Sequence, residues 1–399
     1  MIDRTRVRSV GVIAGLVLAT LATSTLAQEK SASKWFRHGS GIDAAWAISG
    51  DPAKPLQLSI QRKGRAPSAS SKRVLVLYPR PSSAYDIAIT KILQEFDAKD
   101  IDANVTVINF EMNDARGAET IQFAEKNKFD LIFAMGSEST AWLFDNYRDG
   151  TIPVVSVCSK DPVQLGQIKD YERGSGTNFA FTSLNVPVEV QMAYVKELRP
   201  DLKNLAVLVD SKNVSAVQTQ AEPIASYARQ AGIQVIWGAV QNPAKAREEL
   251  VPIVQSAVQT MRKSDPDLTK SLFWMTGSTS VFLEIRTVNE HADRVPVVSV
   301  VPEIVKAGAD TAVLAIGVSF ESNAHLAAIY GAQILAGRKA GDLKVGLVSP
   351  PDIAISFMKA REIGLRIPFN FYESASFIYD YEGRPARTIA SKVLLEKEN

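Results

Sequence analysis

Two short hydroxyl-rich motifs offer the clearest ligand-binding chemistry in this sequence. One apolar run leads into Gly136-Ser137-Glu138-Ser139, and a second leads into Gly277-Ser278-Thr279-Ser280. Each motif precedes a helical stretch and then an apolar run that opens on proline, at Pro153 and at Pro296. Hydroxyl groups and the unpaired N–H groups of a helix start favour anionic groups such as carboxylates. The repetition predicts two related lobes whose turns face each other across a cleft.

Helix capping is the alternative role for the first serine of each motif. Ser137 and Ser278 both stand where a helix should begin, and hydroxyl residues often cap helices at that position. A duplicated fold would duplicate its caps, so the repetition does not separate the two roles. The expected position of both turns at one cleft favours ligand binding.

Other polar residues at predicted strand ends complete the candidate site. Arg80 could clamp a carboxylate because its planar guanidinium can bind both oxygens at once. An amino-acid ligand would also need an anion for its ammonium group. The predicted ligand-binding residues are Arg80, Ser82, Ser83, Asn113, Ser137, Glu138, Ser139, Asp161, Thr182, Asp210, Asn213, Ser278, Glu303 and Ser319. The aromatic residues that could stack on a ligand are Tyr85, Trp142, Phe181, Phe282 and Phe320.

Catalysis has little support in the sequence. The three histidines are His38, in an N-terminal extension, and His291 and His325, within predicted helices. The chain has no Gly-x-Ser-x-Gly elbow, no metal-ligand spacing and no phosphate-binding loop. We therefore predict no catalytic residue, no metal and no cofactor. A periplasmic hydrolase with Cys158 or Ser137 as nucleophile is the less favoured alternative.

The elements that would position these groups alternate from Arg73 onward. Short β-branched runs are separated by amphipathic stretches, such as the apolar face formed by Ile89, Ile92, Leu93 and Phe96. This alternation is typical of parallel βαβ units. The predicted strands cover 74–78, 105–110, 131–135, 154–157, 205–209, 235–237, 272–275 and 297–301. We predict an α/β fold of two doubly wound lobes with mainly parallel sheets, joined by a hinge.

The N-terminus predicts export. Arg4, Arg6 and Arg8 precede an apolar run over 10–26, which ends at Ala27 in the pattern of a cleavable signal peptide. An uncleaved membrane anchor is the alternative, since the run approaches the ~20 residues that a spanning helix needs. The predicted organisation is a signal peptide (1–27), an extension and linker (28–71), lobe 1 (72–180 and 318–344), lobe 2 (181–317 and 345–370) and a C-terminal tail (371–399).

Composition narrows the partners and the location. The chain has 399 residues, a net charge of +2 and one cysteine, Cys158, so it can form no internal disulfide. We expect Cys158 to be a buried apolar residue. Scattered charges give no reason to expect nucleic acid or a membrane-surface helix as a partner. We expect a periplasmic protein without stable membrane insertion of the mature chain.

Ordered patches in the sequence resemble the substrate-binding proteins of ABC transporters, and more closely the subfamily that includes tryptophan- and tyrosine-binding members. The patches are Val186-Pro187-Val188-Glu189, followed by 196–203 and 205–208, together with 159–163, 305–309 and 359–368. The likeness covers about Arg73 to Pro368. It implies a type I periplasmic-binding-protein fold, in which two lobes close on a ligand and deliver it to a membrane permease.

The resemblance makes an exported solute-binding protein for a small polar or zwitterionic ligand the leading hypothesis, with an amino acid as one candidate. Asp161 is then favoured for the ammonium group because it lies in a matching patch. Relatives often have an Asn-Pro turn where this chain has Asp210-Ser211-Lys212-Asn213, and an acidic residue and tyrosine where it has Ser319 and Phe320. These departures leave the ligand open.

The aromatic tail at 369–381 lies outside the resemblance. It could cover an exposed sheet edge. It also motivates the alternative of a ligand-binding sensory module that docks on a receptor or sensor kinase.

Overall fold

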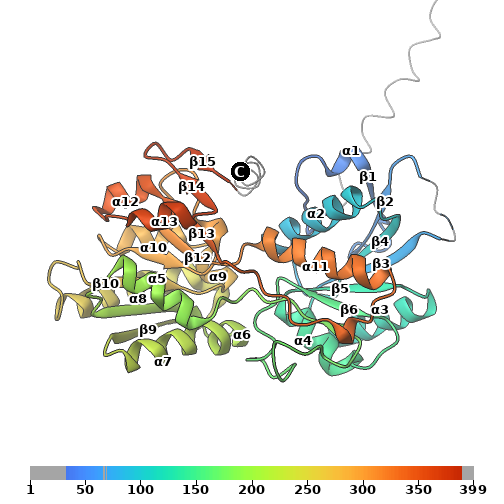
Figure 1. Cartoon of the computed structure of the whole chain (residues 1–399), viewed down its shortest axis with the longest axis horizontal. Helices are drawn as coiled ribbons and strands as arrows, with labels where there is room; N and C mark the ends of the chain where they lie inside the picture. Colours follow the sequence, from blue (N-terminus) through green and yellow to red (C-terminus); the bar gives the residue numbers. More distant parts are fainter. Residues whose placement is uncertain (1–32, 66–67, 69, 389–399) are drawn as a thin grey trace, which may run out of the picture.

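The computed structural model describes residues 33–65, 68 and 70–388, which form two α/β lobes side by side, each built around one sheet (Figure 1). The predicted signal peptide lies outside these residues. Both sheets are mainly parallel and alternate with helices along the chain, so the predicted fold class is confirmed. No helix in the described part of the chain is long and apolar enough to cross a membrane.

The first lobe has a seven-stranded sheet in the order β1-β2-β4-β3-β5-β6-β7. Its strands are β1 (Trp46–Gly50), β2 (Gln57–Arg62), β3 (Lys72–Tyr78), β4 (Ala103–Asn109), β5 (Leu131–Met135), β6 (Val154–Val157) and β7 (Phe179–Ala180). From Val74 to Tyr78, every residue of β3 is completely buried. Such a strand reads as a continuous apolar run because helices cover both faces of a parallel sheet.

The second lobe has an eight-stranded sheet in the order β15-β14-β13-β12-β11-β10-β8-β9. Its strands are β8 (Asn204–Asp210), β9 (Gln234–Val240), β10 (Ser271–Met275), β11 (Val297–Ser299), β12 (Leu314–Gly317), β13 (Asp352–Ser356), β14 (Phe377–Tyr379) and β15 (Pro385–Arg387). The strands from β9 to β12 pair in parallel, and β13 runs antiparallel to β12.

Helices accompany the strands in both lobes. In the first half of the chain they are α1 (Ile42–Ala45), α2 (Ser83–Ala98), α3 (Asp114–Lys126), α4 (Gly136–Tyr147) and α5 (Val188–Leu198). In the second they are α6 (Val214–Ala216), the π-helix η1 (Val217–Ala221), α7 (Glu222–Gln230), the 3₁₀ turn η2 (Pro243–Lys245), α8 (Ala246–Arg262), α9 (Thr279–Phe282), α10 (Ile285–His291), η3 (Pro302–Ile304), α11 (Phe320–Leu335), η4 (Ala340–Asp342), α12 (Phe357–Ile363) and α13 (Phe369–Ser374).

The prediction that residues 28–71 form only an extension and linker needs correction. Within this segment β1 and β2 form an antiparallel hairpin, and β2 pairs antiparallel with β4, with Ile60 opposite Val105. Trp46 and Leu58 are buried by this pairing. The alternation of apolar and polar residues in Leu58-Ser59-Ile60-Gln61 was the available signal, because a strand covered on one face has that period.

The C-terminal segment also belongs to a lobe over much of its length. β14 pairs in parallel with β13, and β15 pairs antiparallel with β14. Residues 377–387 therefore extend the sheet of the second lobe beyond β13. This corrects the predicted tail boundary and agrees with the suggestion that the tail covers a sheet edge.

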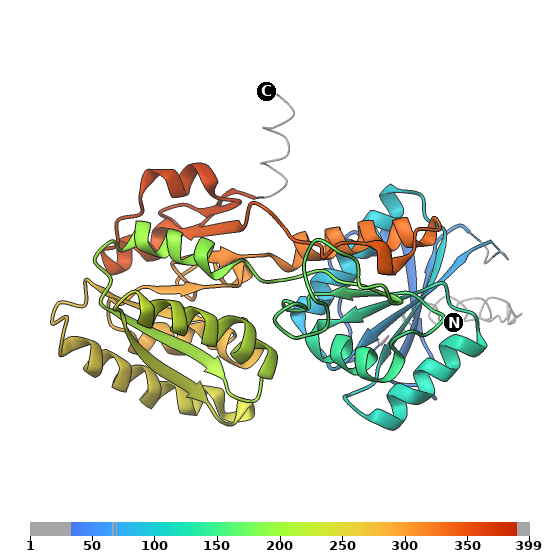
Figure 2. The same ribbon diagram turned by 60° about the horizontal axis from the view of Figure 1, so that its bottom comes forward.

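Three chain segments cross between the lobes (Figure 2). The first follows β7, the second joins β12 to α11, and the third leads from η4 to β13. The first and third run together, since Thr182 and Gly346 form a parallel bridge and the N–H of Ser183 donates to the carbonyl of Gly346 at 2.9 Å. Helix α11 then lies against α2 in the first lobe, as Figure 1 shows. The three crossing segments together form the connection about which the two lobes could rotate as a hinge.

Candidate ligand-binding site

A pocket lies between the lobes, beyond the carboxyl ends of the strands of both sheets. We call it the interlobe pocket. Its lining residues are Arg80, Ser82, Ala84, Tyr85, Ser137, Glu138, Cys158 and Lys160 from the first lobe, Leu184 and Phe320 from crossing segments, and Asn213, Ser215, Gly277, Thr279 and Phe282 from the second. The loops after parallel strands are where open α/β sheets bind ligands. The pocket therefore has the position expected of a ligand-binding site.

A second depression continues the interlobe pocket outward. The two share Ser137, Glu138, Asn213 and Ser215, and the outer part adds residues such as Lys212. Asn213 accepts a hydrogen bond from the N–H of Ala216 at 3.1 Å and so begins α6. The turn after β8 thus presents Asn213 and Ser215 to the first lobe.

An ion pair dominates the wall contributed by the first lobe. The guanidinium of Arg80, after β3, binds the carboxylate of Glu138, in the first turn of α4. The hydroxyl of Tyr85 also donates to the Oε2 atom of Glu138, at a distance of 3.5 Å. Burial, and then the charge of Glu138, raise the pKa of Tyr85 well above its ordinary value, which keeps this hydroxyl a donor.

The glycine of the first motif has a specific steric role. Gly136 has a φ of 76°, in the left-handed region, and a Cβ atom there would lie 2.0 Å from the Oη atom of Tyr85. Only glycine fits both the turn and the close approach of this ring. In the second motif, Gly277 instead donates its N–H to the Oε1 atom of Gln220 at 2.8 Å. The two copies have diverged in how they support the pocket.

The capping interpretation of the repeated serines is wrong. Neither Ser137 nor Ser278 makes a side-chain cap on its own helix. The Oγ atom of Ser137 accepts from the N–H of Lys160 at 3.0 Å, and that of Ser278 accepts from the N–H of Asp210 at 3.3 Å. Ser137 therefore ties its motif to the loop after β6, and Ser278 ties its motif to the last residue of β8. Ser139, completely buried, donates to the carbonyl of Leu77.

The structure divides the predicted site residues into distinct groups. Arg80, Ser82, Ser137, Glu138 and Asn213 line the interlobe pocket. Among the remaining residues, Asn113 and Ser319 cap helices α3 and α11, and Ser83 lines a different groove beside His38. The residues held within the scaffold are Ser139, Asp161, Thr182, Asp210, Ser278 and Glu303.

Asp161 is engaged by its own loop. Its Oδ1 atom accepts from the N–H groups of Val163 and Gln164, at 2.9 and 3.0 Å, and its Oδ2 atom accepts from the hydroxyl of Tyr171 at 2.6 Å. Since both oxygens are satisfied and the residue is not among those that line the interlobe pocket, we no longer assign the ligand's ammonium group to it. Asp210 is similarly occupied by Ser280 and by the N–H of Lys212.

Glu303 lies at the second crossing. Its Oε1 atom accepts from the N–H of Phe320 at 2.5 Å, and its buried Oε2 atom has no partner among the described residues. Ser319, which precedes Phe320, donates its N–H to the Oδ2 atom of Asp352 at 2.9 Å. Burial raises the pKa of Glu303 to about 8, and the charges of Asp352 and Glu321 add to the effect. Two carboxyl groups of the second lobe thus hold the start of α11.

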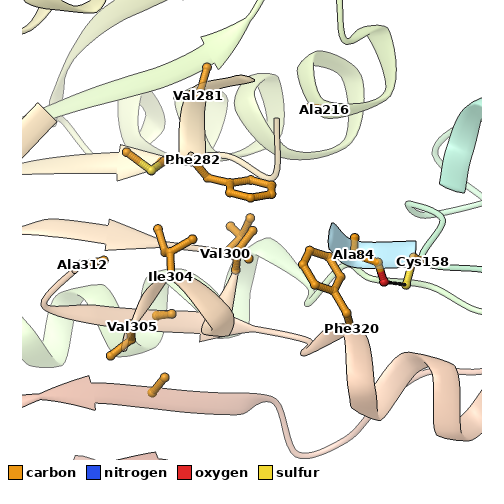
Figure 3. Packing of buried hydrophobic residues seen from close by; sticks show 14 of the residues in the cluster. Ala84, Cys158, Ala216, Val281, Phe282, Val300, Ile304, Val305, Ala312 and Phe320 are labelled. Atoms are coloured by element: carbon orange, nitrogen blue, oxygen red, sulfur yellow. Dashed lines mark hydrogen bonds between the residues drawn. The ribbon is translucent and has the colours of Figure 1, made fainter. Parts of the chain in front are cut away.

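Aromatic side chains close the pocket on the hinge side. The rings of Phe282 and Phe320 lie 6.4 Å apart between their centroids, and both line the pocket. Figure 3 shows Phe320 beside Ala84 and Cys158, with Phe282 on the facing element. Tyr85 also lines the pocket, whereas the predicted stacking residues Trp142 and Phe181 pack against Phe110 and Phe179 within the first lobe.

Several lining residues were missed by sequence reasoning. Lys160, Leu184, Ser215 and Thr279 were not among the predicted ligand-binding residues, although each lies in a loop, in a crossing or in the first two residues of a short helix. Lys160 stands three residues after the end of β6, beside the predicted Asp161, which was the available signal. Cys158 is buried, and its burial raises the pKa of its thiol, so it does not present a reactive thiolate.

Comparison with known proteins agrees with this architecture. Residues 82–377 match the family model of ABC transporter substrate binding proteins. A tyrosine-binding protein of Clostridioides difficile (strain R20291) is 22% identical over 230 residues, which cover 58% of this chain and 61% of that protein. The match therefore spans less than two thirds of that relative's length.

Solved structures show the same fold. An ABC domain from Streptococcus pneumonia in complex with L-Trp has a TM-score of 0.61 at 19% identity, covering 77% of this chain and 100% of that one. A ligand-free, open substrate binding protein with adhesive properties from Clostridium difficile has a TM-score of 0.59 at 19% identity, covering 76% and 98%. The chain belongs to the family of ABC transporter substrate-binding proteins. Members of this family bind small molecules and are not enzymes, which overturns the hydrolase alternative.

Proposed function

We propose that this protein is the periplasmic solute-binding component of an ABC importer, exported by its N-terminal signal peptide. It captures a small polar ligand in the interlobe pocket and delivers it to a membrane permease. An amino acid is one candidate ligand, supported by relatives described as binding tyrosine and L-Trp.

The observation that carries the proposal is the two-sided lining of the interlobe pocket. The first lobe supplies Arg80 and Glu138 at its strand ends, and the second supplies Asn213 and Thr279. A ligand bound there contacts both lobes only when they are closed. The closed state therefore has the higher affinity, and ligand binding raises its population.

Hydrogen bonds between the two lobes support hinge closure. The Nε2 atom of Gln218, in η1 of the second lobe, donates to the carbonyl of Gln164, in the first, at 2.7 Å. Near the hinge, the side chain of Asn185 donates to the carbonyl of Thr219 at 2.7 Å. A π-helical turn leaves such carbonyls open to outside partners, and these turns are frequent at functional sites.

A ligand screen on the purified protein tests the proposal. Thermal shift assays with the common amino acids, organic acids, sugars and phosphate compounds should identify stabilising solutes, and calorimetry should give a stoichiometry of one. The proposal fails if no member of these classes stabilises the fold. The sensory-module alternative predicts a ligand as well, but it also predicts that deletion of an associated permease leaves uptake of that ligand unchanged.

A further inference from the structure

One buried charge in the interlobe pocket has no counter-ion within the described part of the chain. Lys160 is 8% exposed and lines the pocket, yet no described residue forms a hydrogen bond or ion pair with its Nζ atom. The other buried lysine of the described chain, Lys359, is 6% exposed and bonds both carboxylate oxygens of Glu362, at 3.0 and 2.9 Å. Among the described residues, one buried lysine is therefore paired, and the other lines the pocket without a counter-ion.

Burial of an unpaired ammonium group is costly. Proteins normally pair such a group or bind it to a ligand, since the loss of hydration is not otherwise offset. Burial lowers the pKa of Lys160, and the charge of Arg80 acts in the same direction, while Glu138 opposes them. An anion bound beside Lys160 would favour the charged form of this side chain. The side chain is therefore placed to bind a negative partner that none of the described residues supplies.

The carboxylate of Glu138 does not fill this role. It already binds the guanidinium of Arg80 and accepts from the hydroxyl of Tyr85, and it forms no ion pair with Lys160. The charged side chains that line the interlobe pocket are thus two cations and one anion. The lining contribution of the second lobe is neutral: Asn213, Ser215, Gly277, Thr279 and Phe282. This wall can supply hydrogen bonds but no further counter-ion.

We propose that the interlobe pocket selects an anionic solute and that Lys160 binds its oxyanion, a carboxylate or a phosphate group. The inference rests on the proposed function and narrows the class of ligand. The carboxylate of a zwitterion could bind Lys160, but its ammonium group would then lie near Glu138, the anion that lines the pocket, which Arg80 already pairs. The Oγ atom of Ser137 fixes the backbone of Lys160 through the bond to its N–H. Selection for negative charge thus lies in the first lobe, while the hydroxyl and amide groups of the second complete the closed site.

The test compares solutes of different charge on the full-length protein. Succinate, L-glutamate and inorganic phosphate represent anions, L-tyrosine and L-tryptophan represent zwitterions, and ribose represents neutral solutes. Thermal shift and calorimetry are run on the wild type, Lys160→Met and Lys160→Arg. Lys245→Met is the matched control, because Lys245 is exposed on the second lobe and its loss changes net charge equally.

We expect at least one anion to stabilise the wild type and the others to bind much more weakly. Lys160→Met should weaken binding of that anion at least 30-fold without lowering Tm, Lys160→Arg should retain binding within about tenfold, and Lys245→Met should remain within twofold. The identity of the binding anion separates a carboxylate site from a phosphate site. The Tm of each variant without solute shows whether it is folded.

Two results would overturn the inference while leaving the proposed function intact. One is a wild type that binds L-tyrosine, L-tryptophan or ribose more tightly than every anion. The other is a folded Lys160→Met variant that binds the anion within twofold of the wild type. Failure of every solute in the wider screen to stabilise the wild type would instead contradict the proposed function, and the inference would fall with it.

Discussion

The Oδ1 atom of Asn323 accepts a hydrogen bond of 2.7 Å from the backbone N–H of Cys158, across 165 positions of the chain. Asn323 is completely buried in α11, and Cys158 follows β6 with a φ of 53°. The Nδ2 atom of Asn323 also donates to the carbonyl of Ser183, in the first crossing, at 3.1 Å. The side chain of Asn323 thus joins α11 to the loop after β6, which lines the pocket, and to the crossing segment that contains Ser183.

Asn323→Ala should lower the free energy of unfolding by about 2–4 kcal/mol, because it leaves a buried N–H and a buried carbonyl without partners. Urea denaturation followed by circular dichroism measures the loss. Asn370→Ala, at an exposed position, is the control and should stay within about 0.5 kcal/mol of the wild type. Equal stability of the two variants would contradict the role assigned to Asn323.

Gly136→Ala should be far more damaging than Gly277→Ala, although the two glycines open the same motif. The first substitution places Cβ against the hydroxyl of Tyr85 in a left-handed turn, whereas at Gly277 the nearest atom would be Oε1 of Gln220, 3.2 Å away. We expect a loss of about 3 kcal/mol or more for Gly136→Ala and about 1 kcal/mol or less for Gly277→Ala. Thermal denaturation of both variants provides the comparison, and similar losses would refute the distinction.

Gln218→Ala should shift the ligand-free protein toward open conformations. The substitution removes the hydrogen bond between the lobes to the carbonyl of Gln164, which is worth about 0.5–1.5 kcal/mol and so about a 2–10-fold change in the open–closed ratio. Small-angle X-ray scattering should show a larger radius of gyration, with little change in Tm. Gln94→Ala, at an exposed position on α2, is the control. An unchanged radius in Gln218→Ala would show that this bond does not hold the lobes together.

Glu303→Gln should stabilise the protein increasingly as pH rises from 5 to 8. The pKa of Glu303 is raised from 4.5 to about 8 in the folded protein, so the folded state holds more protons than the unfolded chain between these values. The contribution of Glu303 to stability is therefore fully present below 4.5, its pKa in the unfolded chain. This contribution is lost as pH rises toward about 8, its pKa in the folded protein. Glutamine removes the charge while keeping an acceptor for the N–H of Phe320.

Urea denaturation at pH 5, 6.5 and 8 measures this effect. The advantage of Glu303→Gln over the wild type should grow by about 1–3 kcal/mol across the range. Glu373→Gln, at an exposed position on α13, controls for the loss of one carboxylate elsewhere in the second lobe. An advantage that stays constant with pH would show that Glu303 does not titrate as proposed.

Local patterns in the sequence were enough to predict the two-lobed α/β architecture. Apolar runs that lack polar alternation, such as Val74 to Tyr78, indicate strands covered on both faces, and the duplicated Gly-Ser-x-Ser motif marks a strand end in each lobe. The hairpin of β1 and β2 was missed because its short alternating strands follow no helix and stand outside the βαβ pattern. These are local signals, since periodicity and turn chemistry depend on neighbouring residues.

Only the tertiary structure decided which polar groups line the interlobe pocket. Glu138 and Asp161 both follow strands of the first sheet, yet Glu138 lines the pocket while Asp161 is turned into its own loop by Tyr171 and two N–H groups. Lys160, adjacent to Asp161, lines the pocket, and its Nζ atom has no partner among the described residues. Residue type and position along a strand cannot separate these outcomes, because they depend on which hydrogen-bond partners distant segments bring to each side chain. The direction of a side chain at a strand end is set by the assembled lobes, and so is the charge of the pocket.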